Sequence, residues 1–235
     1  MQNVRFALLF VTLLLVQSIG YSQSRQRWSF GPRVGLNLTN FVGGATNFAG
    51  SDVQNTKQVL LPGLSAGLGF VYSDISRFGF GVDLLYSQRG TMIKDGFGPG
   101  TEKVYRVNYL ELPLIGRYYL TSGGKFRPNL YLGAVPALRL NAKVDVDNGT
   151  NTNYADDTQS YRAADLGLTG GVQLNWGTGD RQHFTIDARY THGVSNISAR
   201  TSDLRNQMIT IGLGYNFGIG RQYQPGDRKL PIRPR

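Results

Sequence analysis

The segment NYLELPLIGRYYL, residues 108–120, alternates apolar and polar side chains with a period of two. Successive side chains of a β-strand point to opposite faces. Leu110 and Leu112 therefore share one face of an extended chain, whereas Glu111 and Arg117 share the other. The pattern predicts a strand with one apolar face and one face that carries charge. Whether the apolar face lies inside the protein or against lipid decides the fold class.

The same alternation recurs along the chain. It is found in residues 28–40, 60–72, 78–89, 108–120, 128–144, 164–176, 182–192 and 207–217. The connections alternate in length, because 73–77, 121–125 and 177–181 are short turns, whereas 40–58, 90–104, 145–162 and 193–205 are long polar segments. This sorting, with both ends of the strand region on the short-turn side, is typical of a transmembrane β-barrel with short periplasmic turns and longer outer loops.

The composition of the second face indicates that the leucine faces point outward. That face is rich in glycine, of which the chain has 31 residues, and poor in Lys and Glu. Small residues solvate a surface badly but suit the crowded interior of an eight-stranded barrel, which is barely wide enough for its own side chains. We therefore predict an all-β fold, an eight-stranded antiparallel up-and-down transmembrane β-barrel. The rival is a soluble lipocalin-like barrel with the leucines inside.

Aromatic residues on the apolar face support the membrane interpretation. They gather near the strand ends that meet the short turns, as in an aromatic girdle at a membrane interface. The set is Trp28, Phe30, Phe70, Tyr72, Phe78, Phe80, Tyr118, Trp176, Phe184, Tyr215 and Phe217. This girdle predicts that the periplasmic boundary of the lipid lies close to the short turns.

The chain divides into three predicted parts. Residues 1–22 carry Arg5 and then an apolar run over 6–16 that is too short for the ~20 residues of a spanning helix, so we predict a cleaved signal peptide. Residues 23–217 form the barrel, and residues 218–235 form a basic periplasmic tail. The net charge is +10, but no nucleic-acid-binding motif accompanies it, and we expect no nucleic-acid partner. The absence of cysteine excludes disulfides.

Charged residues occupy the predicted inward face of several strands. The inward row holds Arg33, Asp83, Arg89, Glu111, Arg117, Arg139, Lys143, Asp165, Asp187 and Arg189. Left unpaired, a buried charge costs several kcal/mol, so we predict a lumen salt-bridge network. Its candidate members are Arg33, Asp83, Glu111, Arg117, Arg139, Asp165, Asp187 and Arg189. The network is interpreted as a structural plug, and the alternative is an ion path or a substrate site.

Several motifs together resemble a known family. GPRVGLNLTNF (31–41), NYLELPLIGRYYL (108–120), LYLGAVPALRLNAK (130–143), DLGLTGGVQLNW (165–176) and MITIGLGYNFG (208–218) are similar to segments of the PorT-like outer-membrane β-barrel proteins of Bacteroidota. The resemblance implies an outer-membrane location and a small closed barrel. It implies little about activity.

The last predicted strand also resembles the signal read by the barrel-insertion machinery. Thr210 supplies the polar residue, Gly212 follows two positions on, and Tyr215 and Phe217 supply the alternating aromatics. The resemblance implies that the insertion machinery is a partner of this chain. The chain departs from the usual pattern because it continues past Phe217.

The preferred function is non-enzymatic, a structural or interaction role with no cofactor, no catalytic residue and no metal site. The long polar stretches 47–58 and 144–161 are large enough to bind a partner or a surface glycan. The expected partners are outer-membrane lipid, the insertion machinery and a protein on the surface or in the periplasm.

Three alternatives stay open. An outer-membrane hydrolase would need His192 at the rim, with partners among Asp156, Asp157, Ser195 and Asp203. A metal-binding loop would use Asp145, Asp147 and Asn148, although their spacing lacks the positions of a calcium loop. A small-solute channel conflicts with a charged, glycine-filled lumen of eight strands.

Overall fold

The computed structural model describes residues 28–43, 57–73, 77–94, 102–121, 124–147, 152–178, 181–199 and 203–219. The predicted signal peptide, most of the predicted loop stretch 47–58 and residues 220–235 of the predicted tail lie outside these ranges. No helix among the described residues is long and apolar enough to cross a membrane.

Within the described residues the chain forms eleven strands and one short 3-10 turn. The strands are β1 (Trp28–Gly43), β2 (Lys57–Val59), β3 (Leu61–Ser73), β4 (Phe78–Lys94), β5 (Glu102–Glu111), β6 (Leu114–Tyr119), β7 (Asn129–Asp147), β8 (Thr152–Asp156), β9 (Ala164–Gly177), β10 (Gln182–Gly193) and β11 (Leu204–Ile219), and the 3-10 turn η2 spans Thr158–Ser160. All strand pairings are antiparallel.

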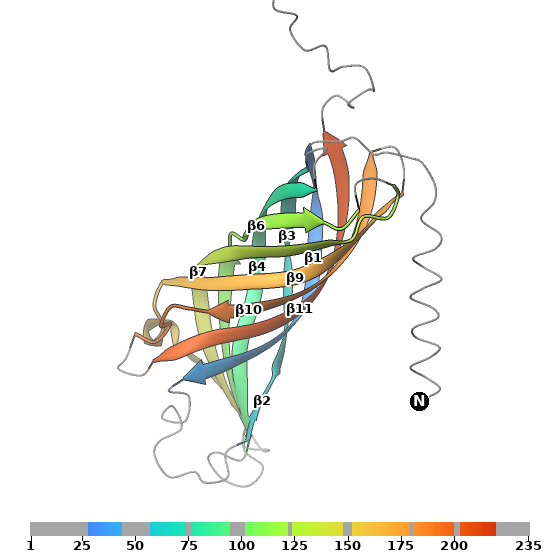
Figure 1. Ribbon diagram of the computed structural model, residues 1–235. Helices are drawn as coiled ribbons and strands as arrows, with labels where there is room; N and C mark the ends of the chain where they lie inside the picture. Colours follow the sequence, from blue (N-terminus) through green and yellow to red (C-terminus); the bar gives the residue numbers. More distant parts are fainter. Residues whose placement is uncertain are drawn as a thin grey trace, which may run out of the picture.

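The strands close into a ring (Figure 1). β1 pairs with β3 on one side and with β11 on the other, from Trp28 opposite Ile219 to Gly43 opposite Leu204. β2 and β3 act as one strand that is broken at Leu60, because both of them pair with β4. In the same way, β5 and β6 act as one strand that is broken at Leu112 and Pro113, because both of them pair with β4 on its other side. β8 pairs with β7. The described ring therefore has eight strands, and the predicted fold is confirmed.

The two ends of the ring differ as predicted. The connections between β3 and β4, β6 and β7, and β9 and β10 are short, and the described chain begins and ends at this same end, which we call the short-turn end. The opposite end, which we call the long-loop end, carries the longer connections. Several strands run further into these connections than predicted: β4 continues to Lys94, β5 begins at Glu102, and β8 forms inside the predicted loop 145–162.

The extra strand residues form a sheet that projects at the long-loop end, toward the bottom of Figure 1. We call it the sheet extension, and it comprises residues 57–59, 92–94, 102–107, 141–147 and 152–156. The sequence predicted loops here because polar residues obscure the alternation. The valines and tyrosines in the predicted loops, such as Val104, Val146 and Tyr154, favour strands.

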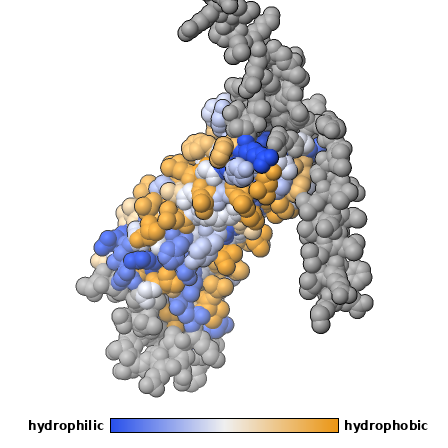
Figure 2. Space-filling model, in the orientation of Figure 1, coloured by the Kyte–Doolittle hydropathy of each residue, from blue (hydrophilic) through white to orange (hydrophobic). Residues whose placement is uncertain are grey.

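The leucine faces of the barrel wall point outward. The exposed fraction is 41% for Leu112, 75% for Leu132 and 58% for Ile211, whereas it is only 4% for Arg33 and 1% for Asp83. On the face that Figure 2 shows, apolar residues cover the middle of the barrel, and polar residues gather toward the long-loop end. A soluble barrel of lipocalin type would show the reverse, so that alternative is wrong.

The predicted aromatic girdle forms a chain of ring contacts at the short-turn end. The ring of Trp28 lies 5.3 Å from that of Phe70 and 4.5 Å from that of Tyr72. Phe78 and Tyr118 lie 5.3 Å apart on the neighbouring strands. Tryptophan and tyrosine rings prefer membrane interfaces because one part of each is apolar and another part is polar. The girdle thus marks one boundary of the lipid-facing wall.

A β-bulge in β7 changes which side chains face inward. Arg139 pairs with Tyr109 and Asn141 pairs with Asn108, so Leu140 is an extra residue without a partner in the ladder. Beyond it Lys143 is exposed, which corrects its predicted inward position. The prediction of unbroken alternation over 128–144 is therefore wrong after Leu140.

On the long-loop side of the bulge the interior of the barrel becomes apolar. A cluster that we call the hydrophobic cap fills the long-loop end of the lumen, and its members are Phe41, Ile93, Tyr105, Val107, Tyr109, Ala137, Ala142, Val144, Tyr161, Ile197 and Leu204. The outside of the sheet extension is polar instead, with Lys94 and Glu102 forming an exposed ion pair. The polarity of wall and interior is thus inverted relative to the lipid-facing part of the barrel, so the sheet extension lies beyond the lipid.

A charge placed on the lipid-facing wall is expected to destabilise the barrel. Leu132→Arg should lower the free energy of unfolding by about 2–4 kcal/mol, because an arginine in the apolar part of a bilayer loses its hydration. Urea titration of the protein refolded in lipid vesicles measures the effect. The matched control is Tyr154→Arg in β8, since Tyr154 is also 75% exposed but lies in the sheet extension. Equal losses in the two variants would contradict the assignment of the lipid-facing wall.

Candidate functional site

The interior of the barrel holds two groups of buried charges. In the first, Arg89 of β4 lies between two carboxylates: its Nε is 2.8 Å from Glu111 of β5, and its Nη1 is 2.9 Å from Asp165 of β9. The side chains of all three are at most 2% exposed. The guanidinium also lies 5.1 Å from the ring centre of Tyr109, and Asn206 donates a hydrogen bond to Asp165 at 2.8 Å. We call this group the upper charge layer, where upper means nearer the long-loop end, which points downward in Figure 1.

The second group, which we call the lower charge layer, joins more strands. Arg189 of β10 lies 2.9 Å from Asp187 and 4.0 Å from Asp83 of β4. Arg33 of β1 lies 3.9 Å from the same Asp83. Tyr131 of β7 donates a hydrogen bond to Asp187 at 2.8 Å. Each carboxylate is thus shared between strands far apart in sequence, and the contacts tie opposite sides of the wall together.

Glycines make room for these long side chains. A Cβ on Gly69 would lie 2.4 Å from Nε of Arg33, and one on Gly214 would lie 2.5 Å from Nη1 of the same residue. A Cβ on Gly212 would lie 2.1 Å from a carboxylate oxygen of Asp187. Real Cβ atoms do not approach other atoms this closely. Because these inward-facing glycines have no side chain, the charged side chains can occupy the space beside them.

The structure places seven of the eight candidate network residues inside the barrel, and they are Arg33, Asp83, Glu111, Arg117, Asp165, Asp187 and Arg189. Arg117 contacts a neutral partner, because it donates to the side-chain oxygen of Gln173. Arg139 does not join the network. It donates to the carbonyl oxygens of Thr158 and Tyr161 near the long-loop end, where it holds the η2 segment against β7.

The candidate set missed the centre of the upper charge layer. Arg89 stands in the inward row, but its place between Glu111 and Asp165 depends on strand register, which alternation alone does not give. Neutral partners were also missed, among them Tyr131 and Asn206. The β4–β5 ladder pairs Arg89 with Val107 and Leu85 with Glu111, so no local pattern in the sequence indicates the contact between Arg89 and Glu111.

The residues proposed for a hydrolase do not assemble. The ring Nδ1 of His192 lies 3.4 Å from the hydroxyl of Tyr190. Ser195 donates to Asp165 at 2.6 Å, and Asp203 pairs with Arg205 at 3.0 Å. Asp156 accepts a hydrogen bond from Thr158, and Asp157 accepts one from Ser160. In the described part of the chain, none of these hydrogen bonds joins His192 to a serine or a carboxylate.

The metal hypothesis gains no support in the described part of the chain. There, no group of three or more His, Asp or Glu side chains is arranged to hold a metal ion. Asp145 and Asp147 lie in β7 opposite Val104 and Glu102, and Asn148 lies outside the described residues.

The predicted insertion-signal residues lie on β11, next to β1. Thr210 faces the lumen and donates to Asn37 at 2.9 Å. Gly212 also faces inward, against Asp187. Phe217 points outward, with its ring centre 5.1 Å from that of Tyr215. The alternation places the two polar-face positions in the lumen and Phe217 on the wall; their role as an insertion signal stays a prediction.

The comparisons agree with this geometry. The family model of the outer membrane protein beta-barrel domain matches residues 21–199. The chain belongs to this family. Among solved structures, this barrel is similar to the outer membrane protein OprG from Pseudomonas aeruginosa, at 13% identity and a TM-score of 0.53 over 85% of this chain and 100% of OprG. It also matches E. coli outer membrane protein W at 15% identity and a TM-score of 0.44, over 83% of this chain and 98% of that one. No curated protein matches the sequence.

Removing the central cation of the upper charge layer is expected to destabilise this outer-membrane barrel. Arg89→Met should lower the free energy of unfolding by about 3–5 kcal/mol, because it leaves Glu111 and Asp165 buried without their counter-charge. Urea titration in lipid vesicles measures the loss.

Two control variants separate the charge effect from packing. Adding Glu111→Gln and Asp165→Asn to Arg89→Met should recover most of the loss, since no unpaired charge then remains. Lys94→Met removes an ion pair whose side chains are 41% and 42% exposed and should cost less than about 1 kcal/mol. A loss for Arg89→Met as small as that for Lys94→Met would contradict the role of the layer.

Proposed function

We propose that the chain is a PorT-like outer-membrane barrel of Bacteroidota type with a non-enzymatic, structural or interaction role. In this proposal a cleaved signal peptide directs export, the barrel-insertion machinery reads β11, and the long-loop end faces the cell exterior. The ligand or partner then meets the barrel at the long-loop end, as a protein or a surface glycan.

One observation carries the proposal: buried side chains fill the middle and the long-loop end of the described lumen. The lower and upper charge layers occupy the lipid-spanning part, and the hydrophobic cap occupies the long-loop end. Packing of this kind works against a continuous water-filled path through the described part of the lumen. A solute channel or a substrate tunnel is thus disfavoured, and the surfaces of the barrel are left as the place where it acts.

The described segments at the long-loop end are held in a defined shape, which suits recognition. Ile197 N donates to Leu204 O at 2.8 Å, and Arg162 N donates to Ile197 O at 2.7 Å. The hydroxyl of Ser195 reaches down to Asp165 of the upper charge layer. These contacts link the segments 157–163, 194–199 and 203–204 to the lumen. A surface that is already ordered loses less conformational entropy when it binds a partner.

The sheet extension presents side chains well beyond the lipid. Tyr154 on β8 is exposed, and Lys143 of β7 pairs across the strand with Asp156. Exposed tyrosines are frequent at protein interfaces because they combine a large apolar area with a polar group. This combination supports the sheet extension as the contact surface.

Conductance measurements test the closed lumen. In planar lipid bilayers the refolded protein should give no stable ion conductance at any voltage that the bilayer withstands. Arg89→Ala combined with Tyr161→Ala and Ile197→Ala removes side chains from both the upper charge layer and the hydrophobic cap, and this variant should show transient conductance. A stable open channel in the unmodified protein would contradict the proposal.

Site-specific photo-crosslinking tests the interaction role in the native membrane. A photoreactive amino acid at Tyr154 should give a discrete crosslinked product with a protein or a glycan. The same probe at Leu132, which is equally exposed but faces lipid, should give lipid adducts alone. Identical product patterns at the two positions would contradict a contact surface on the sheet extension.

A further inference from the structure

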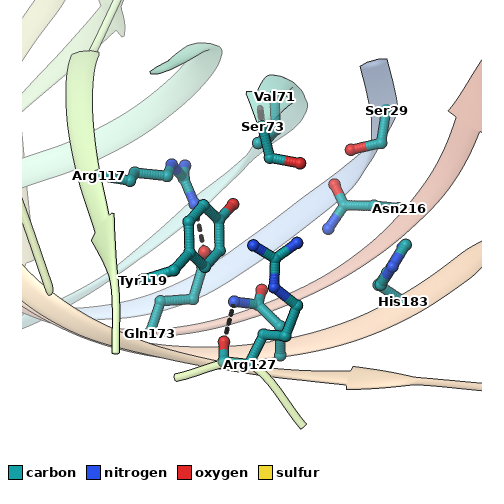
Figure 3. Close-up of a pocket in the computed structure, with 10 residues that line it drawn as sticks. Ser29, Val71, Ser73, Arg117, Tyr119, Arg127, Gln173, His183 and Asn216 are labelled. Atoms are coloured by element: carbon teal, nitrogen blue, oxygen red, sulfur yellow. Dashed lines mark hydrogen bonds between the residues drawn. The ribbon is translucent and has the colours of Figure 1, made fainter. Parts of the chain in front are cut away.

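The lumen has a pocket at the short-turn end (Figure 3). Its volume is about 40 Å³, room for roughly three water molecules. The lining residues are Ser29, Val71, Ser73, Arg117, Tyr119, Arg127, Gln173, Asn175, His183 and Asn216. The lining carries two guanidinium groups together with hydroxyl and amide groups, and none of these described lining residues is a carboxylate. Its chemistry is that of a hydrogen-bond donor site with positive charge.

Arg117 brings a buried charge to this pocket without an anionic contact. The residue is only 4% exposed and donates to the side-chain oxygen of Gln173. That oxygen also accepts a hydrogen bond from Asn129, at 3.4 Å. The Nε of Arg117 is buried and has no hydrogen-bond partner among the described residues. A neutral amide satisfies part of the guanidinium but does not balance its charge.

Arg127 brings a second cation from the connection between β6 and β7. Its backbone is fixed, because Arg127 N donates to Asn175 O at 2.8 Å and Asn175 Nδ2 donates to Arg127 O at 2.7 Å. Its guanidinium lies 4.1 Å from the ring centre of Tyr119, and its buried Nε also lacks a partner in the described chain. Burial lowers the pKa of Arg127 below its usual value, which reflects the same lack of compensation. Figure 3 shows both guanidinium groups directed into the pocket.

The lower charge layer does not supply the missing negative charge. Its two carboxylates already face other cations: Asp187 contacts Arg189, and Asp83 lies between Arg189 and Arg33. The other lumen carboxylates, Glu111 and Asp165, are held by Arg89 in the upper charge layer. Positive charge is therefore in excess at the short-turn end of the described lumen.

We propose that this pocket binds a small oxyanion, a phosphate or a carboxylate group that enters from the short-turn end. An oxyanion in the pocket would give the guanidinium groups of Arg117 and Arg127 a charged acceptor, and such acceptors form the strongest hydrogen bonds that guanidinium groups make. The hydroxyl of Ser29 and the amide of Asn216 line the same space and supply further donors. Water alone would fill the pocket without balancing its charge. The pocket is too small for a whole organic solute, so a larger molecule would insert only its anionic group.

Titration of the full-length protein in detergent micelles tests the site, with inorganic phosphate as the probe and ionic strength held constant with chloride. The arginine Nε–Hε signals are followed by NMR. The signals of Arg117 and Arg127 should shift saturably. Arg127→Gln should weaken phosphate binding about tenfold, the effect of losing one charged hydrogen bond. Arg127 lies outside the strands, so this variant keeps the test valid even when Arg117→Gln fails to fold.

The matched control is Arg77→Gln. Arg77 lies at the same end of the barrel, is exposed, and contacts Tyr118 outside the pocket, so its loss should leave phosphate binding unchanged. A parallel titration with acetate distinguishes the source, because tighter binding of phosphate indicates a phosphate group and tighter binding of acetate indicates a carboxylate group. The proposal is overturned if neither anion shifts the two signals saturably, or if Arg77→Gln and Arg127→Gln weaken binding equally.

Discussion

The rest of the structure depends on the closure of the strand ring between β1 and β11. The apolar part of a bilayer offers no water to the backbone, so each N–H and C=O of a spanning segment needs a partner within the protein. A sheet meets this requirement only when its two edge strands pair, as Trp28–Gly43 and Leu204–Ile219 do here. The closed ring then fixes how much interior volume the side chains must share.

That shared volume explains the unusual composition. Eight strands enclose a narrow interior, and the chain fills it with arginines and carboxylates that need glycine opposite them. An apolar filling would bury the same volume at lower desolvation cost. The charged filling has a different merit, since contacts such as those of Asp83 with both Arg33 and Arg189 depend on the correct register of strands distant in sequence. A register error would leave these charges unpaired.

Much of this fold follows from the sequence, for a physical reason. Lipid outside and a crowded interior inside impose a strict period of two, so Leu132 and Ile211 on one face and Arg33 on the other were assigned correctly. Alternation gives a residue's face but not its neighbours across the barrel. The central place of Arg89 and the departure of Arg139 toward Thr158 depend on register and on the bulge, which no local pattern reveals. The hydrophobic cap was missed because Tyr161 and Ile197 come from segments without strand periodicity.

The bulge at Leu140 restricts the lengths that β7 can adopt to changes by an even number of residues. One residue there separates a portion of β7 that shows apolar side chains to lipid from a portion that turns them inward. Deleting that residue would move each later side chain of β7 to the opposite face of the sheet, and inserting a second residue would do the same. Insertion or deletion of two residues would keep each later side chain on its present face. Insertions and deletions within the projecting half of β7 are therefore tolerated in even steps, because Ala142 and Val144 then keep their places in the hydrophobic cap.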